Sequence, residues 1–171
     1  ATLSSMADNG KQQTHINILP GMVSPADMRY LHEIMREFEI DAVIFPDYSK
    51  SLDNVFTHEY QLIPSGGTKI KDIRRTGTAK ATIEFGTVFA KASTRVRATK
   101  NTPTAGEWLQ DNRYIRNFQM PLPIGINACD HFYNTLCKIG NKKMPEKFVE
   151  ERGRLVDSYV DGHKYVFGKK V

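Results

Sequence analysis

Two cysteines are the first residues in this sequence that could hold a metal or form a redox bond. Cys129 and Cys137 lie eight positions apart in a segment with helical periodicity, so helical rise separates them by about 12 Å. That separation is too long for a disulfide or for two ligands of one metal ion. An iron–sulfur cluster needs several converging thiolates, which two cysteines do not supply. We therefore expect two buried free thiols.

The histidines do not have the spacing of a metal site on a helix. No His-x-x-x-His or Glu-x-x-His pattern includes any of the five, which are His15, His32, His58, His131 and His163. His163 falls on the apolar stripe of a predicted C-terminal helix, where we expect a hydrogen-bonded packing residue. We interpret the other four as surface or structural residues.

One loop carries the best candidates for ligand contact. Asp47 and Asp53 flank a polar loop that follows a predicted buried strand, and the carboxyl ends of strands are where open α/β sheets bind ligands. A role as loop caps competes with ligand contact and is favoured. Gly66-Gly67-Thr68 precedes a predicted helix and could cradle a phosphate. It lacks the lysine of a P-loop, so simple turn chemistry is the preferred interpretation.

Paired carboxylates for acid–base chemistry are not supplied by the adjacent Glu150 and Glu151. Neighbouring residues on a helix point about 100° apart, so these two cannot act on one substrate atom. Glu151 could instead pair with Arg154 or Lys147 on an exposed helix face. The sequence thus offers no residue that we assign as catalytic, cofactor-binding or metal-ligating.

Composition sets further bounds. The 171 residues carry a formal charge of +5, and no aromatic is interleaved with the basic positions Lys91, Arg95, Arg97 and Lys100, so we expect a solvated loop and no nucleic-acid partner. No apolar run reaches the roughly 18 residues of a membrane span. The first residues lack a signal-peptide layout, and a cytoplasmic location follows as the default.

Strands and helices are predicted to alternate along most of the chain. Apolar or alternating runs predict four strands, over 15–19, 42–45, 81–85 and 114–120. Helical patterns with start signals predict five helices, over 25–38, 69–73, 104–109, 127–140 and 145–167. The composition of 87–103 predicts a further helix broken by an exposed loop. Ser24, Thr68 and Asn127 are the predicted N-caps, Ser24 with Pro25 and Asp27 behind it. The order indicates an α/β domain in three layers, with a short, mostly parallel sheet of about four strands flanked by helices.

The last predicted helix is long, and the chain ends soon after it. Its apolar stripe is formed by Phe148, Leu155, Val156, Tyr159, Val160, His163 and Phe167. We expect a linker over 1–14, the α/β domain over 15–141 and a connecting helix over 142–171 that leads into a further domain. Part of its stripe should then be exposed beside Tyr159, His163 and Phe167.

Several segments together resemble a known family. They are Ile16-Asn17-Ile18-Leu19-Pro20-Gly21, Phe45-Pro46-Asp47, Ser51-Leu52-Asp53, Gly66-Gly67-Thr68, Pro121-Leu122-Pro123-Ile124-Gly125-Ile126 and Glu151-Arg152-Gly153-Arg154-Leu155-Val156-Asp157. In this order they resemble the middle portion of beta chains in the nitrogenase component 1 family. The resemblance covers nearly the whole chain.

The resemblance implies the second of three Rossmann-like domains, with Ala1 near the end of a preceding helix and Val171 at the first strand of the next domain. It implies a parent oxidoreductase that reduces dinitrogen to ammonia as an α2β2 tetramer, with electrons from an ATP-driven iron protein. The parent complex would hold an iron–sulfur P-cluster and, in the alpha chain, an iron–molybdenum cofactor. The family's beta-chain cluster cysteines lie in the domain before this one. No cluster ligand and no activity are therefore expected in this part alone.

Two alternatives stay open. Cofactor-assembly scaffold proteins of the same superfamily share the architecture and similar Pro-Asp and Gly-Gly-Thr loops, although the Glu151–Asp157 run favours the catalytic beta chain. A nucleotide- or sugar-phosphate-binding Rossmann domain is the weaker alternative, because no Gly-x-Gly-x-x-Gly follows a strand.

Overall fold

The computed structural model describes residues 4–53, 55, 56, 58, 60, 62, 66–86 and 103–170. The chain forms two compact units, Ala1–Leu122 and Pro123–Val171. The broken helix predicted over 87–103 lies outside the described residues, apart from Pro103. The division of a longer protein into domains stays a prediction.

A parallel sheet of four strands organises the first unit. The strands are β1 (Ile16–Leu19), β2 (Ala42–Ile44), β3 (Ala81–Phe85) and β4 (Arg116–Met120). They are hydrogen-bonded in the order β2-β1-β3-β4, and every pair is parallel. The predicted α/β class and parallel sheet are confirmed. The fourth strand was predicted to begin at Tyr114, but Tyr114 ends the preceding helix in a left-handed conformation, with φ of 56°.

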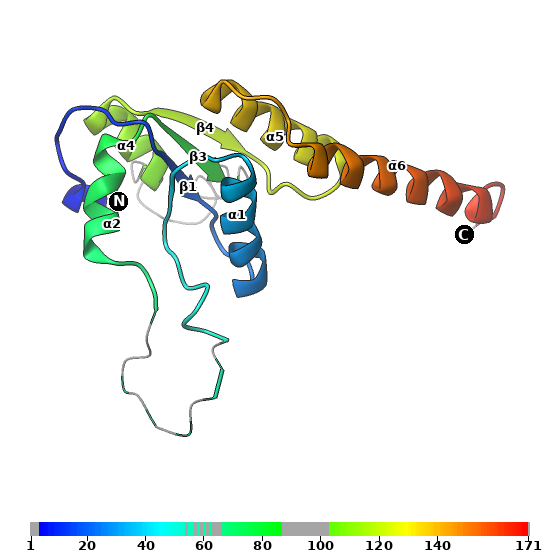
Figure 1. Ribbon diagram of the computed structural model, residues 1–171, viewed down its shortest axis with the longest axis horizontal. Helices are drawn as coiled ribbons and strands as arrows, with labels where there is room; N and C mark the ends of the chain where they lie inside the picture. The colour runs from blue at the N-terminus through cyan, green and yellow to red at the C-terminus, as the bar shows by residue number, and fades with distance from the viewer. Residues whose placement is uncertain are drawn as a thin grey trace. The chain divides into compact units, whose positions relative to one another are not determined.

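The helices of this unit form layers on both sides of the sheet. They are α1 (Pro25–Glu37), α2 (Ile70–Arg75) and α4 (Ala105–Arg113), with short 3-10 turns η1 (Ser4–Met6) and η2 (Thr76–Thr78). The step from β1 to β2 runs opposite in direction to the steps from β2 to β3 and from β3 to β4. Right-handed crossovers therefore place α1 on one side and α2 and α4 on the other (Figure 1).

The two faces of the sheet are both buried but differ in chemistry. Side chains alternate between the faces of a strand, so Ile16, Ile18 and Ile83, all fully buried, share the face toward α1. The opposite face carries Asn17, Thr82 and Asn117, which are direct partners across β1, β3 and β4. The amide of Asn17 donates to Thr82 at 3.1 Å and to the Thr76 carbonyl at 2.9 Å. A polar row therefore crosses the face that packs against η2 and α4.

The predicted start of α1 is confirmed. The hydroxyl of Ser24 accepts a hydrogen bond from the Asp27 N–H at 3.1 Å and donates to the Asp27 carboxylate at 2.7 Å. Pro25 occupies the first helical position, where a missing N–H is harmless. Met28, Leu31, Ile34 and Met35 form the buried face of the helix.

Two predicted N-caps are wrong. The N-cap of α2 is Lys69 rather than Thr68, whose hydroxyl bonds the main chain of Asp47 instead. In the second unit, α5 (Ile126–Gly140) begins one residue before Asn127. Its N-cap is Gly125, which adopts a φ of 78° that a residue with a side chain rarely takes. Backbone geometry therefore decides this helix start.

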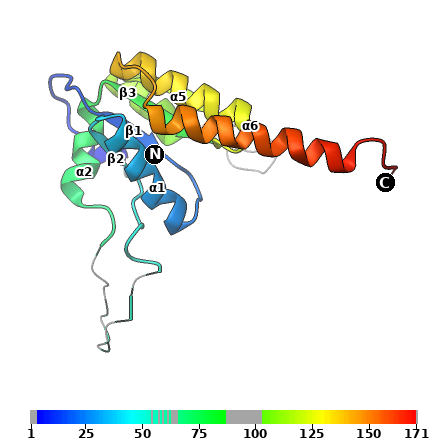
Figure 2. The same cartoon turned by 45° about the vertical axis from the view of Figure 1, so that its right-hand side comes forward.

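The second unit pairs α5 with α6 (Glu146–Val166), which lie side by side over part of their length (Figures 1 and 2). The rings of Tyr133 and Phe148 stack with centroids 4.8 Å apart, and Arg152 pairs with Asp130 through two hydrogen bonds of 2.8 Å. Farther along α6 the apolar stripe is uncovered: Tyr159 is 54% exposed and Phe167 is 76% exposed. The predicted exposure beside Tyr159, His163 and Phe167 is confirmed.

Candidate functional site

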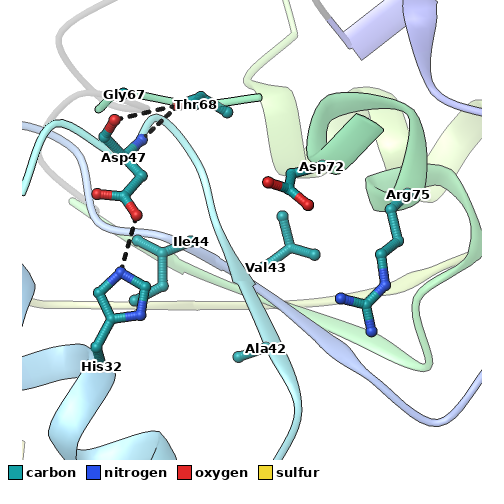
Figure 3. Close-up of a pocket in the computed structure, with 9 residues that line it drawn as sticks. All are labelled: His32, Ala42, Val43, Ile44, Asp47, Gly67, Thr68, Asp72 and Arg75. Carbon is teal, nitrogen blue, oxygen red and sulfur yellow. Dashed lines mark hydrogen bonds and ion pairs between the residues drawn. The ribbon is translucent and has the colours of Figure 1, made fainter. Parts of the chain in front are cut away.

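A small polar pocket lies beside β2 in the first unit and includes several of the predicted candidates (Figure 3). Its volume is about 110 Å³, and its lining consists of His32, Ala42, Val43, Ile44, Asp47, Gly67, Thr68, Asp72 and Arg75. Asp47 follows β2 and His32 comes from α1, whereas Asp72 and Arg75 come from α2. The fold thus brings together polar side chains from α1, α2 and the loop after β2 that are up to 43 positions apart.

Asp47 is the centre of the hydrogen bonding at this pocket. One carboxylate oxygen contacts His32 Nε2 at 2.9 Å, and the other accepts the Ser49 N–H at 2.9 Å. The main-chain N–H of Asp47 donates to the hydroxyl of Thr68 at 2.6 Å. Asp47 therefore joins α1, its own loop and the segment before α2, which confirms the prediction that it acts as a loop cap.

The ionised form of Asp47 is favoured by these contacts. Burial opposes ionisation, but hydrogen bonds from Ser49 and His32 outweigh burial and hold the pKa of Asp47 below its usual range. Its acceptor sites toward His32 and Ser49 are occupied by this chain's own donors. The carboxylate therefore binds groups of this chain, His32 and the Ser49 N–H, rather than a ligand.

Asp53 also serves the loop. Arg29, one turn before His32 on α1, contacts both oxygens of Asp53 at 2.8 Å and donates to the Ser49 carbonyl at 2.6 Å. The hydrogen bonds and charge of Arg29 hold the pKa of Asp53 below its usual range. The loop after β2 is thus tied to α1 at two points.

Size and charge limit what the pocket can hold. Drug-sized ligands and cofactors occupy roughly 300–1,000 Å³, and a water molecule takes about 30 Å³. At about 110 Å³, the pocket accommodates a few waters but not a nucleotide. Arg75, its one strong cation, is paired with Asp41. Gly66 and Gly67 adopt positive φ values of 115° and 83°, in agreement with the preferred interpretation of this segment as simple turn chemistry.

The remaining candidates are scattered over the structure. The thiol of Cys129 donates to the Pro123 carbonyl at 3.0 Å, and burial raises the pKa of both Cys129 and Cys137. Both are free and half-buried, in partial agreement with the prediction of buried thiols. Arg154 pairs with Glu150 at 3.3 Å.

The histidines also differ in their surroundings. His15 is buried and bonds the Arg75 carbonyl at 3.0 Å. His58 contacts the ring of Phe56, and the carbonyl of His131 accepts from Thr135 at 2.8 Å. His163 was predicted to be a packing residue, but it is exposed with its ring against Phe167. The described part of the chain brings no three His, Cys, Asp or Glu side chains into a metal-binding group.

One polar cluster was missed from the sequence. Glu84 on β3 is only 9% exposed and accepts hydrogen bonds from Thr104, Gly106 and Asn117. The Thr-x-x-Glu pattern from Thr104 to Glu107 is a local signal for the helix start at this point, and both bonds of that capping box are present. Nothing local signals that Glu84 joins it.

Comparison with known proteins defines the class. The family model described as Nitrogenase component 1 type Oxidoreductase matches residues 1–171. This chain belongs to that family. Among its described residues, no helix has both the length and the apolar content to cross a bilayer.

The relatives are of two kinds. The chain is 34% identical over 96% of its length to the nitrogenase molybdenum-iron protein beta chain of Clostridium pasteurianum, covering 32% of that protein. It is 29% identical over 99% of its length to the nitrogenase iron-molybdenum cofactor biosynthesis protein NifN of Rhizobium meliloti, covering 36%. A solved structure titled "Nitrogenase Cp1 at pH 6.5" superposes with a TM-score of 0.80 at 30% identity over 99% of this chain and 37% of that chain. The chain spans about a third of the length of these relatives.

Proposed function

We propose that this chain is the structural middle domain of a nitrogenase component 1 beta subunit. The observation that carries the proposal is its 34% identity over 96% of its length to about a third of a nitrogenase molybdenum-iron protein beta chain. The fold match to the solved chain titled "Nitrogenase Cp1 at pH 6.5", at a TM-score of 0.80, supports it. The Glu151–Asp157 run on α6 supports the catalytic beta chain. The parent protein would then reduce dinitrogen to ammonia with electrons from an ATP-driven iron protein.

The parent assembly would be a cytoplasmic α2β2 heterotetramer with an iron–sulfur P-cluster and an iron–molybdenum cofactor. The residues of this chain do not fit a cluster: Cys129 and Cys137 lie on one helix, and burial disfavours their thiolates, which are the form that binds iron. The domain's contribution is to hold neighbouring parts of the protein in place. We expect no activity from it alone.

A cofactor-assembly scaffold is the second candidate. It is favoured by the similarity to NifN proteins of Rhizobium meliloti and Mesorhizobium japonicum, at 29% and 28% identity. A beta chain of Nostoc is 30% identical, so identity alone does not separate the two roles. A scaffold would hold a precursor cluster without reducing dinitrogen.

The two roles differ in a direct assay. The full-length protein, purified with its partner chain, is supplied with iron protein, ATP and reductant, and ammonia is measured together with bound iron. A catalytic beta chain yields ammonia, whereas iron without ammonia supports the scaffold. Replacing Cys129 and Cys137 together by alanine should leave the iron content unchanged; a loss of iron would place ligands in this domain and contradict the proposal.

We further propose that α6 connects this domain to the next and that its exposed stripe packs against the rest of the full-length protein. Tyr159→Ser should then lower the free energy of unfolding of the full-length protein by about 1–3 kcal/mol. Tyr165→Ser, at a position 76% exposed and off the stripe, is the matched control and should change it little. Equal effects of the two substitutions would contradict the connecting role.

A further inference from the structure

The start of α4 is occupied by a carboxylate from the sheet. Oε2 of Glu84 accepts from the Thr104 hydroxyl at 2.8 Å and from the Asn117 amide at 3.0 Å. Oε1 accepts the Gly106 N–H at 3.3 Å, which belongs to the first turn of the helix. Three donors from two other elements therefore converge on one buried acid. Such hydrogen bonds offset the free-energy cost of removing a charged group from water.

The helix is in close contact with this carboxylate. A Cβ atom placed on Gly106 would lie 2.5 Å from both Glu84 Oε2 and Asn117 Nδ2. Both of those atoms are already held by hydrogen bonds to each other. The space above the first turn is thus filled by the acid and its partners.

The contact between Glu84 and α4 lies near the point where the strand order of the sheet reverses. The chain runs from β1 outward to β2 and then to the other side, to β3 and β4. The carboxyl ends of β1 and β3 therefore border the crevice where open α/β sheets bind ligands. α4 follows β3, and the first-turn N–H groups of such a helix are the usual receptor for a ligand phosphate.

We propose that Glu84 is a built-in anion that takes the place of a ligand phosphate at the start of α4. The carboxylate satisfies the donors that a phosphate would use and repels a second negative charge. The β3–α4 half of the sheet therefore rejects nucleotides and sugar phosphates, which argues against the third of the functions considered from the sequence. This inference is independent of the role of the parent complex.

Hydrogen exchange at the Gly106 amide tests the proposal in the full-length protein. In the wild type, added inorganic phosphate or formate should leave the exchange rate unchanged. Glu84→Ala should accelerate exchange at Gly106 by at least about tenfold, because a hydrogen bond to a charged group is lost. Formate should slow exchange again in this variant, whereas chloride at the same ionic strength should not.

Three results would overturn the proposal: protection of Gly106 by phosphate in the wild type, an unchanged exchange rate in Glu84→Ala, or no rescue by formate. Should Glu84→Ala fail to fold, Glu84→Gln retains the size of the side chain, removes its charge and replaces one acceptor oxygen by an NH2 donor. Faster exchange at Gly106 in Glu84→Gln supports the built-in anion, and wild-type exchange contradicts it. Glu150→Gln, at an exposed pair on α6, controls for general loss of a carboxylate and should leave Gly106 unchanged.

Discussion

The hydroxyl of Thr104 and the carboxylate of Glu84 lie 2.8 Å apart although twenty positions separate them along the chain. The same hydroxyl accepts the Glu107 N–H at 3.2 Å, so it caps α4 and binds β3 at once. Thr104 therefore joins the start of α4 to β3, alongside the Gly106 N–H that Glu84 also accepts. The Thr104 side chain thus contributes both to the capping of α4 and to the attachment of α4 to β3.

Thr104→Ala should lower the free energy of unfolding by about 1–2 kcal/mol, at the upper part of the range for a lost N-cap, because the buried Glu84 also loses a donor. Thr104→Ser keeps the hydroxyl and should recover most of this loss. Ser24→Ala at the start of α1, where the acid partner is exposed, should have a smaller effect. Urea unfolding measures all three; equal losses for alanine and serine at position 104 would contradict the double role.

Gly106→Ala should destabilise the protein although alanine is the better helix former. The favourable propensity is about 1 kcal/mol, whereas forcing a methyl group against the held side chains of Glu84 and Asn117 costs about 1–3 kcal/mol. Gly153→Ala on α6 meets nothing within 4 Å and should be stabilising. Thermal unfolding of the two variants should therefore shift in opposite directions. Shifts of the same sign would show that the contact at Gly106 relaxes freely.

Stability should fall as the pH drops below about 6.5, the ordinary pKa of histidine, because of His15. Burial lowers the pKa of His15 in the folded protein, so the unfolded chain binds the proton first and acid favours unfolding. The contribution is complete above the unfolded pKa and is lost as the pH falls through the folded one. His15→Gln keeps a donor toward the Arg75 carbonyl and should flatten the pH dependence in urea titrations. An unchanged slope would assign it to other groups.

Asp47 should add a second pH dependence at lower pH. Its folded pKa lies below its usual range, so its contribution to stability is present above the unfolded pKa of about 3.9 and is lost as the pH falls through the folded value. Asp47→Asn should remove this dependence. The exposed Asp161→Asn, paired with Lys164 on α6, is the control. An identical acid profile for both variants would contradict the assignment to Asp47.

The parts of the fold that depend on local patterns were predictable from the sequence. The run Ala42–Ile44 is apolar throughout and forms a buried strand, and Ser24 sits next to the N–H groups that it caps. Thr68 has the type of an N-cap, but its partner is the main chain of Asp47, twenty-one positions away. A tertiary contact, which no local pattern encodes, determines whether Thr68 caps α2 or binds the loop after β2.

The candidate site shows the same limit. Asp47 was selected because it follows a strand, and its role as a cap needs only Ser49, two residues on. Glu84 alternates with apolar residues in β3 like any half-buried strand residue. Its partners Thr104 and Asn117 are brought to it only once β4 and α4 have assembled on β3. The alternating pattern therefore predicts the strand but not the burial or the hydrogen-bond partners of Glu84.

The row of Asn17, Thr82 and Asn117 across the sheet has a consequence for strand alignment. Sliding one strand by two residues returns every side chain to its original face, so apolar burial alone barely distinguishes the shifted sheet from the native one. On β3 the shifted alignment would set the Asn17 amide, now 3.1 Å from the Thr82 hydroxyl, opposite Lys80 or Glu84 instead. A buried amide without its partner costs about 1–3 kcal/mol. The polar row therefore favours the native alignment of these short strands over one shifted by two residues.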